Sequence, residues 1–319
     1  MVPKVFLTEP IPHYEILVDL LREYAETKVS DIFPKIVPPE SLKGCIAVVV
    51  GDSIIDAESL KYADELKLVQ KFGAGINTID IKACDSRGIY VCNIPGVNAL
   101  DVAEYVIGAM ISSLRGFLRM DEAARRAAWD ERPALIGERL SNKTVGIIGL
   151  GRIGCEVTRL LKPFKGIKIL AYDPYVAPSL AESLGVKMVD LKTLLEESDI
   201  VTIHVPLSEE TKGLICEREL NYMKTSAVLI NTARGQIVEE KALYQALKNG
   251  RIKYAVIDVW AEEPLKPGNP IFELRNVQLS IHTASWTHQF FEEAMKLCAE
   301  NVIRVVKGEK PLNIVSASI

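Results

Sequence analysis

The feature that most constrains this chain is a glycine-rich loop that runs from Gly149 to Gly154. The apolar run TVGII precedes the loop directly, and the helix-like run CEVTRLL follows it. In a strand–loop–helix unit, the first glycine allows a tight turn and the third lets the helix pack closely on the strand. The middle glycine, Gly151, lets the backbone approach a pyrophosphate at the positive end of the helix. The loop, with Arg152 and Ile153 inside it, therefore predicts a dinucleotide site, and a glycine-rich turn without a ligand is the alternative.

The second strand of this unit, IKILAYD, ends in an acid, Asp173. A carboxylate at that position accepts hydrogen bonds from the adenosine ribose hydroxyls, and it would repel a 2′-phosphate. The next two residues, Pro174 and Tyr175, supply no cation for such a phosphate. The sequence therefore predicts NAD in preference to NADP, and an ordinary turn acid is the alternative interpretation of Asp173.

Short β-branched runs alternate with helix-period segments along the chain, which is typical of α/β proteins with parallel sheets. The first part has predicted helices at Tyr14–Tyr24 and Ile81–Arg87 and predicted strands at Lys4–Thr8, Ile46–Val50, Leu66–Lys71 and Ile89–Asn93. The second part has predicted strands at Thr144–Gly149, Ile167–Tyr172, Ile200–His204, Ala227–Asn231, Tyr254–Val259 and Val277–Ile281. These patterns predict two doubly wound parallel-sheet domains.

The larger domain is expected to be a Rossmann NAD-binding domain at residues 100–285. The smaller one is expected to be a flavodoxin-like substrate domain. We expect it to be discontinuous, with residues 1–99 plus 286–319, because chain termini often lie close together and the amphipathic segment His288–Lys307 would return to it. A long helical pattern from about Ala99 to Arg126 would connect the domains. The irregular stretch Arg126–Lys143 would either wrap around a partner subunit or cap its own domain, and both interpretations stay open.

The composition argues against several classes of protein. The net charge is -4 and no block of like charges occurs, so no nucleic-acid or membrane-surface partner is expected. The N-terminal run MVPKVFLTEP lacks the features of a signal peptide, and no segment approaches the ~20 apolar residues of a membrane span. The six cysteines are scattered without a CxxC pair. We therefore expect a cytoplasmic protein with no metal site and no disulfide framework.

Three polar residues follow predicted strands of the larger domain: Arg234, Glu263 and His282. Parallel sheets bind ligands at the carboxyl ends of their strands, so these side chains can converge on one crevice. Arginine suits a bidentate grip on a carboxylate, and histidine suits proton exchange with a hydroxyl or carbonyl near neutral pH. A carboxylate beside the histidine would favour the imidazolium. Taken singly, each residue has an ordinary structural interpretation, as a surface ion-pair partner, a solvated acid or a turn residue.

Several segments are similar to those of the D-isomer-specific 2-hydroxyacid dehydrogenase family, over nearly the full length of the chain. The segments are VGIIGLGRIG at 145–154, YDP at 172–174, INTARGQIVEE at 230–240, DVWAEEP at 258–264, IHTASWT at 281–287, FGAGINTID at 72–80 and GIYVCNIPG at 88–96. The resemblance includes the phosphoglycerate dehydrogenases and the glyoxylate and hydroxypyruvate reductases of that family. It implies an NAD-dependent oxidoreductase that interconverts a small D-2-hydroxy acid and its 2-oxo acid.

The resemblance also implies a role for each site residue. His282 would be the acid–base residue, Glu263 its partner, and Arg234 the residue that holds the substrate carboxylate and polarises the carbonyl. Backbone amides around Ala74 and Gly75 would hold the same carboxylate from the smaller domain. The residues implied to face the cofactor, besides the glycine loop and Asp173, are Val205, Thr232, Ala233 and Asp258. A hinged homodimer follows from the same resemblance, with the Arg126–Lys143 stretch as its arm.

The sequence departs from the family pattern at two places that bear on the substrate. Many members have proline before the catalytic histidine, where this chain has Ile281. Phosphoglycerate-specific relatives often carry an Arg-Ser pair after the third strand of the small domain, where this chain has Gly51-Asp52-Ser53. The Asp52 carboxylate would repel a phosphate. We also expect no C-terminal regulatory domain in this chain. We therefore expect an unphosphorylated substrate, and Phe72 and Trp286 suggest an apolar pocket for its side chain, although Lys71 lies nearby.

Two other functions compete with this prediction. One keeps the scaffold and oxidises a different small anion, of the formate or phosphite type, and the acid at Glu263 argues against it. The other is a non-enzymatic NAD-sensing, corepressor-like scaffold, which the presence of Arg234, Glu263 and His282 disfavours, although fold alone does not fix function.

Overall fold

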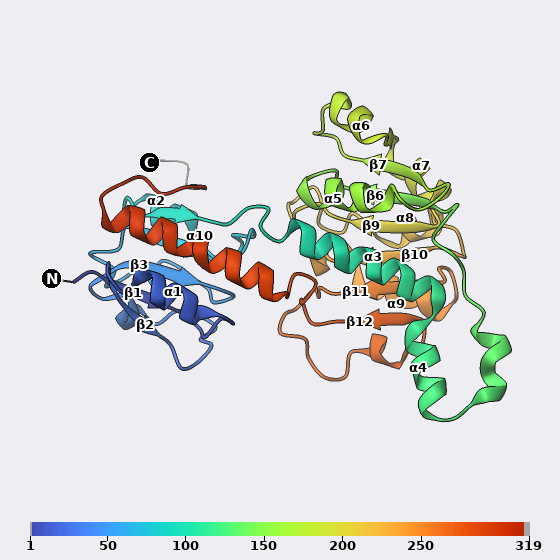
Figure 1. Ribbon diagram of the computed structural model, residues 1–319, viewed down its shortest axis with the longest axis horizontal. Helices are drawn as coiled ribbons and strands as arrows, with labels where there is room; N and C mark the ends of the chain where they lie inside the picture. Colours follow the sequence, from blue (N-terminus) through green and yellow to red (C-terminus); the bar gives the residue numbers. More distant parts are fainter. Residues whose placement is uncertain (1, 316–319) are drawn as a thin grey trace. The chain divides into compact units, whose positions relative to one another are not determined.

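The computed structural model describes residues 2–315, and the chain divides into two compact units. The smaller unit comprises the residues up to Asn98 and those from Trp286 on, and the larger unit comprises Ala99–Ser285. The chain therefore passes between the units twice, at residues 98–99 and at residues 285–286. Figure 1 follows this path, with the long helix α10, near the red end, running beside the blue strands of the smaller unit.

The smaller unit contains a five-stranded sheet in the order β2-β1-β3-β4-β5, with every strand parallel to its neighbours. The strands are β1 (Lys4–Leu7), β2 (Glu26–Val29), β3 (Cys45–Val50), β4 (Leu68–Lys71) and β5 (Tyr90–Cys92). The order reverses between β1 and β3, as in a flavodoxin-like sheet. The central strands are almost fully buried, which is expected for parallel strands covered on both faces.

Helices cover both faces of this sheet. On one face, α1 (Tyr14–Leu21) and α10 (His288–Val306) pack together and bury their apolar stripes on the strands. On the other face lie the 3₁₀ helix η1 (Pro39–Leu42) and α2 (Ile81–Asp85). Thr287 is the N-cap of helix α10, and its hydroxyl accepts a hydrogen bond from the amide of Phe290. The C-terminal segment thus completes the core of the N-terminal fold.

The larger unit contains a seven-stranded parallel sheet in the order β12-β11-β10-β9-β6-β7-β8. Its strands are β6 (Thr144–Ile148), β7 (Lys168–Tyr172), β8 (Lys187–Met188), β9 (Ile200–Ile203), β10 (Val228–Asn231), β11 (Tyr254–Ile257) and β12 (Val277–Leu279). The order reverses between β6 and β9, so the switch point of this sheet lies at the end of β6. The last residues of five strands are in register, in the order Ile148, Ile203, Asn231, Ile257 and Leu279. The loops that follow these strands therefore lie side by side at one edge.

Helices also cover both faces of the larger sheet. One face carries α3 (Ala99–Arg115), α5 (Arg152–Leu161) and α6 (Pro178–Leu184), and α3 packs against α5. The other face carries α7 (Leu191–Glu197), α8 (Glu217–Tyr222), α9 (Glu240–Lys248) and the 3₁₀ helices η3 (Gly235–Ile237) and η4 (Pro270–Glu273). An arm follows α3, formed by α4 (Phe117–Arg125) and η2 (Trp129–Leu135).

The elements differ from the sequence prediction in three places. Strands β2 and β8 were not predicted; β2 has the polar sequence ETKV at a sheet edge, and β8 has two residues. The helix predicted from Ala99 to Arg126 is two helices, because Gly116 adopts a left-handed conformation with φ +69° that ends α3. The loop at Gly137 returns to that point, where a Cβ would lie 2.8 Å from the carbonyl oxygen of Leu114.

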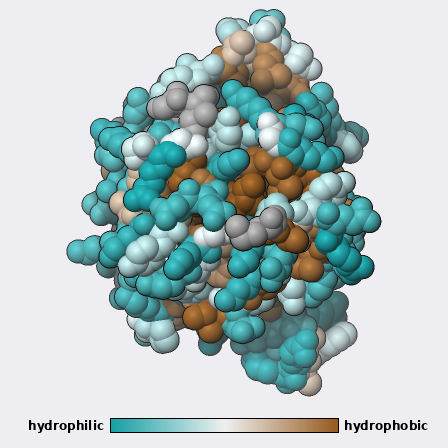
Figure 2. All heavy atoms as spheres, turned by 90° about the vertical axis from the view of Figure 1, so that its left-hand side faces the viewer, coloured by the Kyte–Doolittle hydropathy of each residue, from teal (hydrophilic) through white to brown (hydrophobic). Residues whose placement is uncertain are grey.

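Figure 2 shows one face of the molecule, on which hydrophilic side chains predominate and hydrophobic side chains form separate patches. Large apolar side chains of both sheets are buried in the cores. In residues 2–315, no helix combines the length and apolar character that crossing a bilayer requires.

Candidate active site

Polar side chains from three adjacent strands gather at the carboxyl edge of the larger sheet. Arg234 comes shortly after β10, Asp258 directly after β11, and His282 shortly after β12. Because these strands end in register, the segments that follow them lie next to one another. The edge therefore brings together Arg234 and His282 of the predicted catalytic set, and Glu263 follows Asp258 in the loop after β11.

The turn that carries Arg234 is held by the buried side chain of Asn231. The amide of Ala233 donates to Asn231 Oδ1 at 3.1 Å, and Asn231 Nδ2 donates to the carbonyl of Arg234 at 3.0 Å. The half-buried guanidinium donates from Nη1 to the carbonyl of Ala233 at 2.6 Å. An arginine whose backbone is fixed in this way is well suited to bind a planar carboxylate through its guanidinium.

Gly235 brings the Arg234 turn against the turn that follows β11. A Cβ at this position would lie 1.9 Å from the carbonyl carbon of Trp260 and 2.3 Å from the amide nitrogen of Ala261. Any side chain would collide with this backbone, so glycine permits the close approach. The turn bearing Arg234 is thereby packed next to the one that leads to Glu263.

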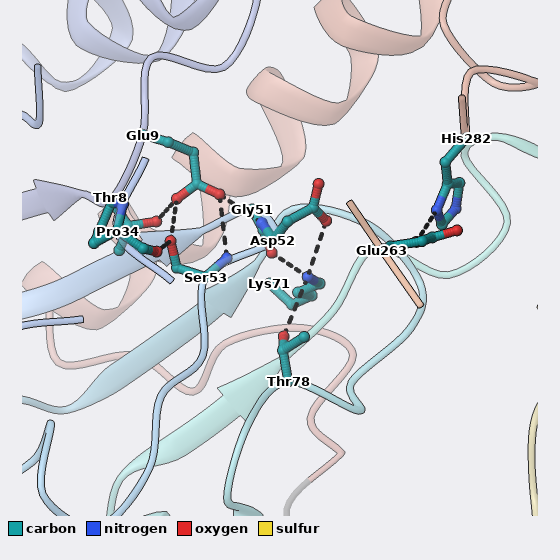
Figure 3. A network of polar contacts seen from close by, with 10 residues as sticks. All are labelled: Thr8, Glu9, Pro34, Gly51, Asp52, Ser53, Lys71, Thr78, Glu263 and His282. Atoms are coloured by element: carbon teal, nitrogen blue, oxygen red, sulfur yellow. Dashed lines mark hydrogen bonds and ion pairs between the residues drawn. The ribbon is translucent and has the colours of Figure 1, made fainter. Parts of the chain in front are cut away.

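Glu263 and His282 form an ion pair, with Glu263 Oε2 2.8 Å from His282 Nδ1 (Figure 3). The other carboxylate oxygen, Oε1, accepts a hydrogen bond of 3.0 Å from the amide of Trp260. The carboxylate is therefore held by the backbone on one side and binds the imidazole on the other. With Nδ1 engaged by Glu263, the ring nitrogen that points away from the carboxylate is Nε2.

The environment shifts the pKa values of both members of this pair. The Glu263 hydrogen bond raises the pKa of His282, and burial and the charge of Arg234 oppose the rise. Burial alone would raise the pKa of Glu263, but the hydrogen bond and charge of His282, with smaller contributions from the Trp260 amide and Arg234, lower it. The pair therefore favours a charged imidazolium beside a charged carboxylate near neutral pH, which is the form that can donate a proton.

Asp258, directly after β11, is 1 % exposed. Its carboxylate accepts hydrogen bonds from Ser280 Oγ at 2.6 Å, from the amide of Thr283 at 2.8 Å and from the amide of Ala284 at 3.0 Å. These contacts direct the carboxylate toward the segment that carries His282. The expected contact of Asp258 with the nicotinamide end stays a prediction.

The glycine loop occupies the switch point of the sheet and has the geometry of a cofactor cradle. Gly149 has φ +94°, and a Cβ there would lie 2.8 Å from both the carbonyl carbon of His204 and Val205 Cγ1. A Cβ on Gly154 would lie 2.2 Å from the carbonyl oxygen of Gly149. A Cβ on Gly151, by contrast, would meet no described atom within 4 Å. Packing therefore requires glycine at the first and third positions. The middle glycine leaves the start of α5, where Arg152 and Ile153 lie, accessible to an anion.

The side chain of Asp173 is anchored at the rim of this loop. Its Oδ2 accepts from the amide of Leu150 at 2.9 Å, and its Oδ1 accepts from the amide of Tyr175 at 2.9 Å. Each oxygen has further acceptor capacity for a ribose hydroxyl. Asp173 therefore stands where the sequence predicted a ribose-binding acid, directly beside the glycine loop.

Two buried polar atoms at the same edge have no protein partner among residues 2–315. They are Nδ1 of His204, which follows β9, and Oγ1 of Thr232, which follows β10 next to Ala233. Burial lowers the pKa of His204 to about 3, so this imidazole is neutral at physiological pH. Buried groups of this kind usually bind a ligand or water. Together with the open glycine cradle, they fit a bound dinucleotide.

In the smaller unit, Ala74 and Gly75 lie in the loop after β4, where Ala74 is exposed. Asn93 Nδ2 donates to the carbonyl of Ala74 at 2.7 Å, and the amide of Ile94 donates to the carbonyl of Gly73 at 3.1 Å. Both bonds use carbonyl groups of the loop. Its backbone is thus anchored through acceptors, which leaves the amide donors of Ala74 and Gly75 suited to hold a carboxylate.

A second polar cluster lies at the carboxyl ends of β1, β3 and β4, as Figure 3 shows. Glu9, 2 % exposed, accepts hydrogen bonds from the amides of Asp52 and Ser53 and from Ser53 Oγ at 3.1 Å. Burial raises the pKa of Glu9, and these hydrogen bonds oppose the rise. The buried Lys71 donates to the carbonyl of Gly51, and its Nζ lies 4.0 Å from Asp52 Oδ1. The two buried ionisable groups therefore hold the Gly51–Ser53 turn from opposite sides.

Sequence reasoning missed the residues that support the site. Asn231 stands inside the segment INTARG, where a polar residue at the end of an apolar strand was the available signal. Ser280 and Tyr105 had no such signal, because their hydroxyl groups meet at 2.6 Å across 175 positions of sequence. Glu9 and Ser53 likewise meet across 44 positions.

Comparisons with known proteins agree with this geometry. The family described as D-isomer specific 2-hydroxyacid dehydrogenase, NAD binding domain, matches residues 107–284. A glyoxylate reductase of Korarchaeum cryptofilum is 38 % identical, over 100 % of this chain and 97 % of that protein. A D-3-phosphoglycerate dehydrogenase of Archaeoglobus fulgidus is 40 % identical over 84 % of this chain, which spans only 51 % of that protein. The solved D-lactate dehydrogenase of Aquifex aeolicus, complexed with NAD and lactic acid, superimposes with a TM-score of 0.86 at 27 % identity, covering 98 % of this chain and 99 % of that one.

These matches confirm the predicted fold class, with its Rossmann domain and second parallel-sheet domain, and they confirm NAD as the cofactor. They also confirm that the chain is an oxidoreductase of hydroxy and oxo acids. The chain therefore belongs to the D-isomer-specific 2-hydroxyacid dehydrogenase family, as an NAD-dependent enzyme.

Proposed function

We propose that this enzyme reduces a small, unphosphorylated 2-oxo acid to its D-2-hydroxy acid, and catalyses the reverse oxidation, with Arg234, Glu263 and His282 as its catalytic set. The observation that carries the proposal is the His282–Glu263 ion pair of 2.8 Å beside the fixed turn of Arg234. The cofactor, when bound, supplies or accepts the hydride at C2 of the substrate.

The protein residues have separate tasks in this reaction. In reduction, His282 donates a proton from Nε2 to the 2-oxo oxygen, and in oxidation the neutral ring accepts the hydroxyl proton. Glu263 keeps Nδ1 protonated and orients the ring. Arg234 binds the carboxylate of the substrate and polarises its carbonyl. Residues of the smaller unit, the amides of Ala74 and Gly75, hold the same carboxylate, which makes that unit the substrate domain.

The proposal is tested by His282→Ala and His282→Gln, assayed as NADH consumption and as NADH affinity by fluorescence titration. Turnover should fall by about 10²-fold or more, the usual size of lost acid–base catalysis, while the affinity for NADH is retained. His288→Ala provides a matched control, because His288 is an exposed histidine of the smaller unit. Turnover at the normal rate in His282→Ala would refute the catalytic assignment.

The preference for an unphosphorylated substrate rests on the Gly51–Ser53 turn. The Asp52 carboxylate is fully exposed there, and it lies 4.0 Å from the ammonium of Lys71, which is buried against the carbonyl of Gly51. An incoming phosphate would therefore meet an acid before the lysine. Phe72 stacks on Phe291 with ring centroids 5.7 Å apart, and this supports an apolar wall for the substrate side chain. Glyoxylate, hydroxypyruvate and longer 2-oxo acids should be reduced with higher kcat/KM than 3-phosphohydroxypyruvate.

The preference for NAD over NADP rests on Asp173, whose carboxylate stands beside the glycine loop, where it would repel a 2′-phosphate. In Asp173→Ala, NADH should bind about 10-fold more weakly and NADPH more tightly than in the parent enzyme, because a ribose acceptor and a repulsive charge are both lost. Unchanged discrimination would place the ribose contact elsewhere.

We also propose that two copies of the chain assemble through the arm of α4 and η2, and that the protein is located in the cytoplasm. Trp129 in the arm is 76 % exposed and Ile136, which directly follows η2, is 86 % exposed, and a second copy would cover both. All six cysteines are free thiols, which fits a reducing compartment. Sedimentation should give a dimer that Ile136→Asp converts to monomer.

A further inference from the structure

The backbone of His282 has φ +59°, the left-handed region that few non-glycine residues adopt. A histidine persists in that conformation only where the surrounding contacts determine it. The Glu263 contact fixes the imidazole ring and leaves the backbone free to relax. The structure must therefore hold the His282 backbone by other contacts.

Asp258 supplies contacts on both sides of His282. The amide of His282 itself donates to the main-chain carbonyl of Asp258 at 2.6 Å. The carboxylate of Asp258 accepts from Ser280 Oγ before the histidine and from the amides of Thr283 and Ala284 after it, at 2.6, 2.8 and 3.0 Å. A single buried residue directly after β11 thus binds four residues of the turn, Ser280, His282, Thr283 and Ala284.

The chain of hydrogen bonds continues from Ser280 to α3. Tyr105 Oη lies 2.6 Å from Ser280 Oγ. Ser280 has one hydroxyl proton, which it donates to the Asp258 carboxylate, so the phenol of Tyr105 must be the donor to Ser280. The carbonyl of Ser280 also accepts from Trp260 Nε1 at 2.9 Å. Trp260 therefore takes part in both sets of contacts. Its amide binds the Glu263 carboxylate that holds the imidazole ring, and its indole binds the segment before His282.

We propose that Tyr105, Ser280 and Asp258 form a positioning network that holds the backbone of His282 in its left-handed conformation and so aims the imidazole for proton transfer. None of the three needs to touch the substrate in this role. The inference rests on the proposed function of His282 as the acid–base residue. It gives Asp258 a task that is independent of any contact with the cofactor.

The test uses the full-length enzyme and the variants Ser280→Ala and Tyr105→Phe. Each removes one hydroxyl from the network, so kcat should fall about 3- to 10-fold, the ratio expected for one lost hydrogen bond. The Kd of NADH, measured by fluorescence titration, should stay unchanged. Ser280→Thr, which keeps the hydroxyl, should restore kcat. Tyr254→Phe is the matched control, because Tyr254 is another half-buried tyrosine of the same unit and stands outside the network.

A second readout reports the geometry of His282 without turnover. The chain has four histidines, so the imidazole signals can be assigned in an NMR titration with one His→Gln variant for each. In Ser280→Ala the ring should lose part of its contact with Glu263, and the pKa of His282 should fall toward the ordinary histidine value. A residue that only stabilises the fold would lower Tm and leave this pKa in place.

A double variant tests whether the residues act through one another. If Tyr105 acts through Ser280, Tyr105→Phe combined with Ser280→Ala should be no slower than Ser280→Ala alone. The proposal is overturned if both single variants keep the parent kcat and the parent His282 titration, or if the loss of kcat is matched by an equal weakening of NADH binding. Failure of the proposed function looks different, since His282→Ala would then turn over at the normal rate.

Discussion

Each unit of the enzyme places charged residues at the carboxyl edge of a parallel sheet, but the two edges are built differently. In the larger unit the side chains of Glu263 and His282 stand partly exposed, at 37 % and 43 %. In the smaller unit the ionisable groups Glu9 and Lys71 are buried, and they bind the backbone of the Gly51–Ser53 turn. The pair at the larger edge stands partly open at the surface, and the buried pair at the smaller edge shapes a loop.

This difference separates two tasks that share the same topology. A proton-transfer residue must reach the substrate and titrate near neutral pH, which requires exposure and a partner such as Glu263. A recognition surface requires backbone donors in fixed positions, and buried charges can fix them at the expense of their own desolvation. The comparison therefore predicts large effects on chemistry from the larger edge and smaller effects on selectivity and stability from the smaller edge.

The sharpest contrast should come from the two cations. Arg234→Ala should lower kcat/KM by about 100-fold or more, because it removes a charged partner of the substrate carboxylate. Lys71→Met should lower it by no more than about 10-fold, because Lys71 binds the Gly51 carbonyl. Steady-state kinetics with a 2-oxo acid measures both, and Arg234→Lys tests whether the planar fork is needed. A larger loss from Lys71→Met than from Arg234→Ala would reverse the roles assigned to the edges.

An intermediate effect is expected from Glu263→Gln, seen mainly in the pH profile. Glu263 raises the pKa of His282, so the reductive rate, which needs the imidazolium, persists above the ordinary histidine pKa and falls as pH passes the raised value. The variant lacks this support, so its reductive rate should begin to fall at lower pH than that of the parent enzyme. The oxidative rate needs the neutral ring and should rise at lower pH than in the parent enzyme. Identical profiles for the two enzymes would show that the ion pair does not control proton transfer.

The smallest effect should come from Glu9, as a dependence of stability on pH. Its pKa is raised in the folded state, so its contribution to the free energy of unfolding is greatest below the unfolded pKa and declines as pH rises through the folded value. Glu9→Gln should remove that decline, so the difference in Tm between variant and parent should change with pH across this range. The exposed Glu23 gives a control, as Glu23→Gln. A constant difference in Tm with pH would contradict the assignment.

The features of this enzyme that could be predicted from the sequence are those that depend on residues close together along the chain. The glycine loop, Asp173 and the strand that ends before His282 are local patterns, and each was found from spacing. Strand β2 was missed because its residues ETKV carry no apolar alternation, although pairing with β1 makes it a strand. Such a segment takes its structure from its neighbour and offers no signal of its own.

The candidate site shows the same division. Arg234 and His282 were predicted from their places after strands. The contacts of Asp258 with Ser280 and Ala284 were not predictable, since they depend on how segments more than twenty positions apart meet in three dimensions. The sequence predicted the candidate reacting groups, and the structure was needed to find the groups that contact them.

The double passage of the chain between the units has a consequence for biosynthesis. His13 and His288 hydrogen bond at 2.7 Å across 275 positions, and α10 supplies a face of the core of the smaller unit. On the ribosome, β1 to β5 emerge first together with α1, η1 and α2, but one face of their sheet stays only partly covered until α10 is made, after roughly 190 further residues, or about 10–40 s at ordinary elongation rates. The larger unit, whose residues are contiguous, is complete before then. The nascent N-terminal strands are thus the part of this chain that most needs a chaperone, and slowing translation near residue 290 should increase aggregation during synthesis.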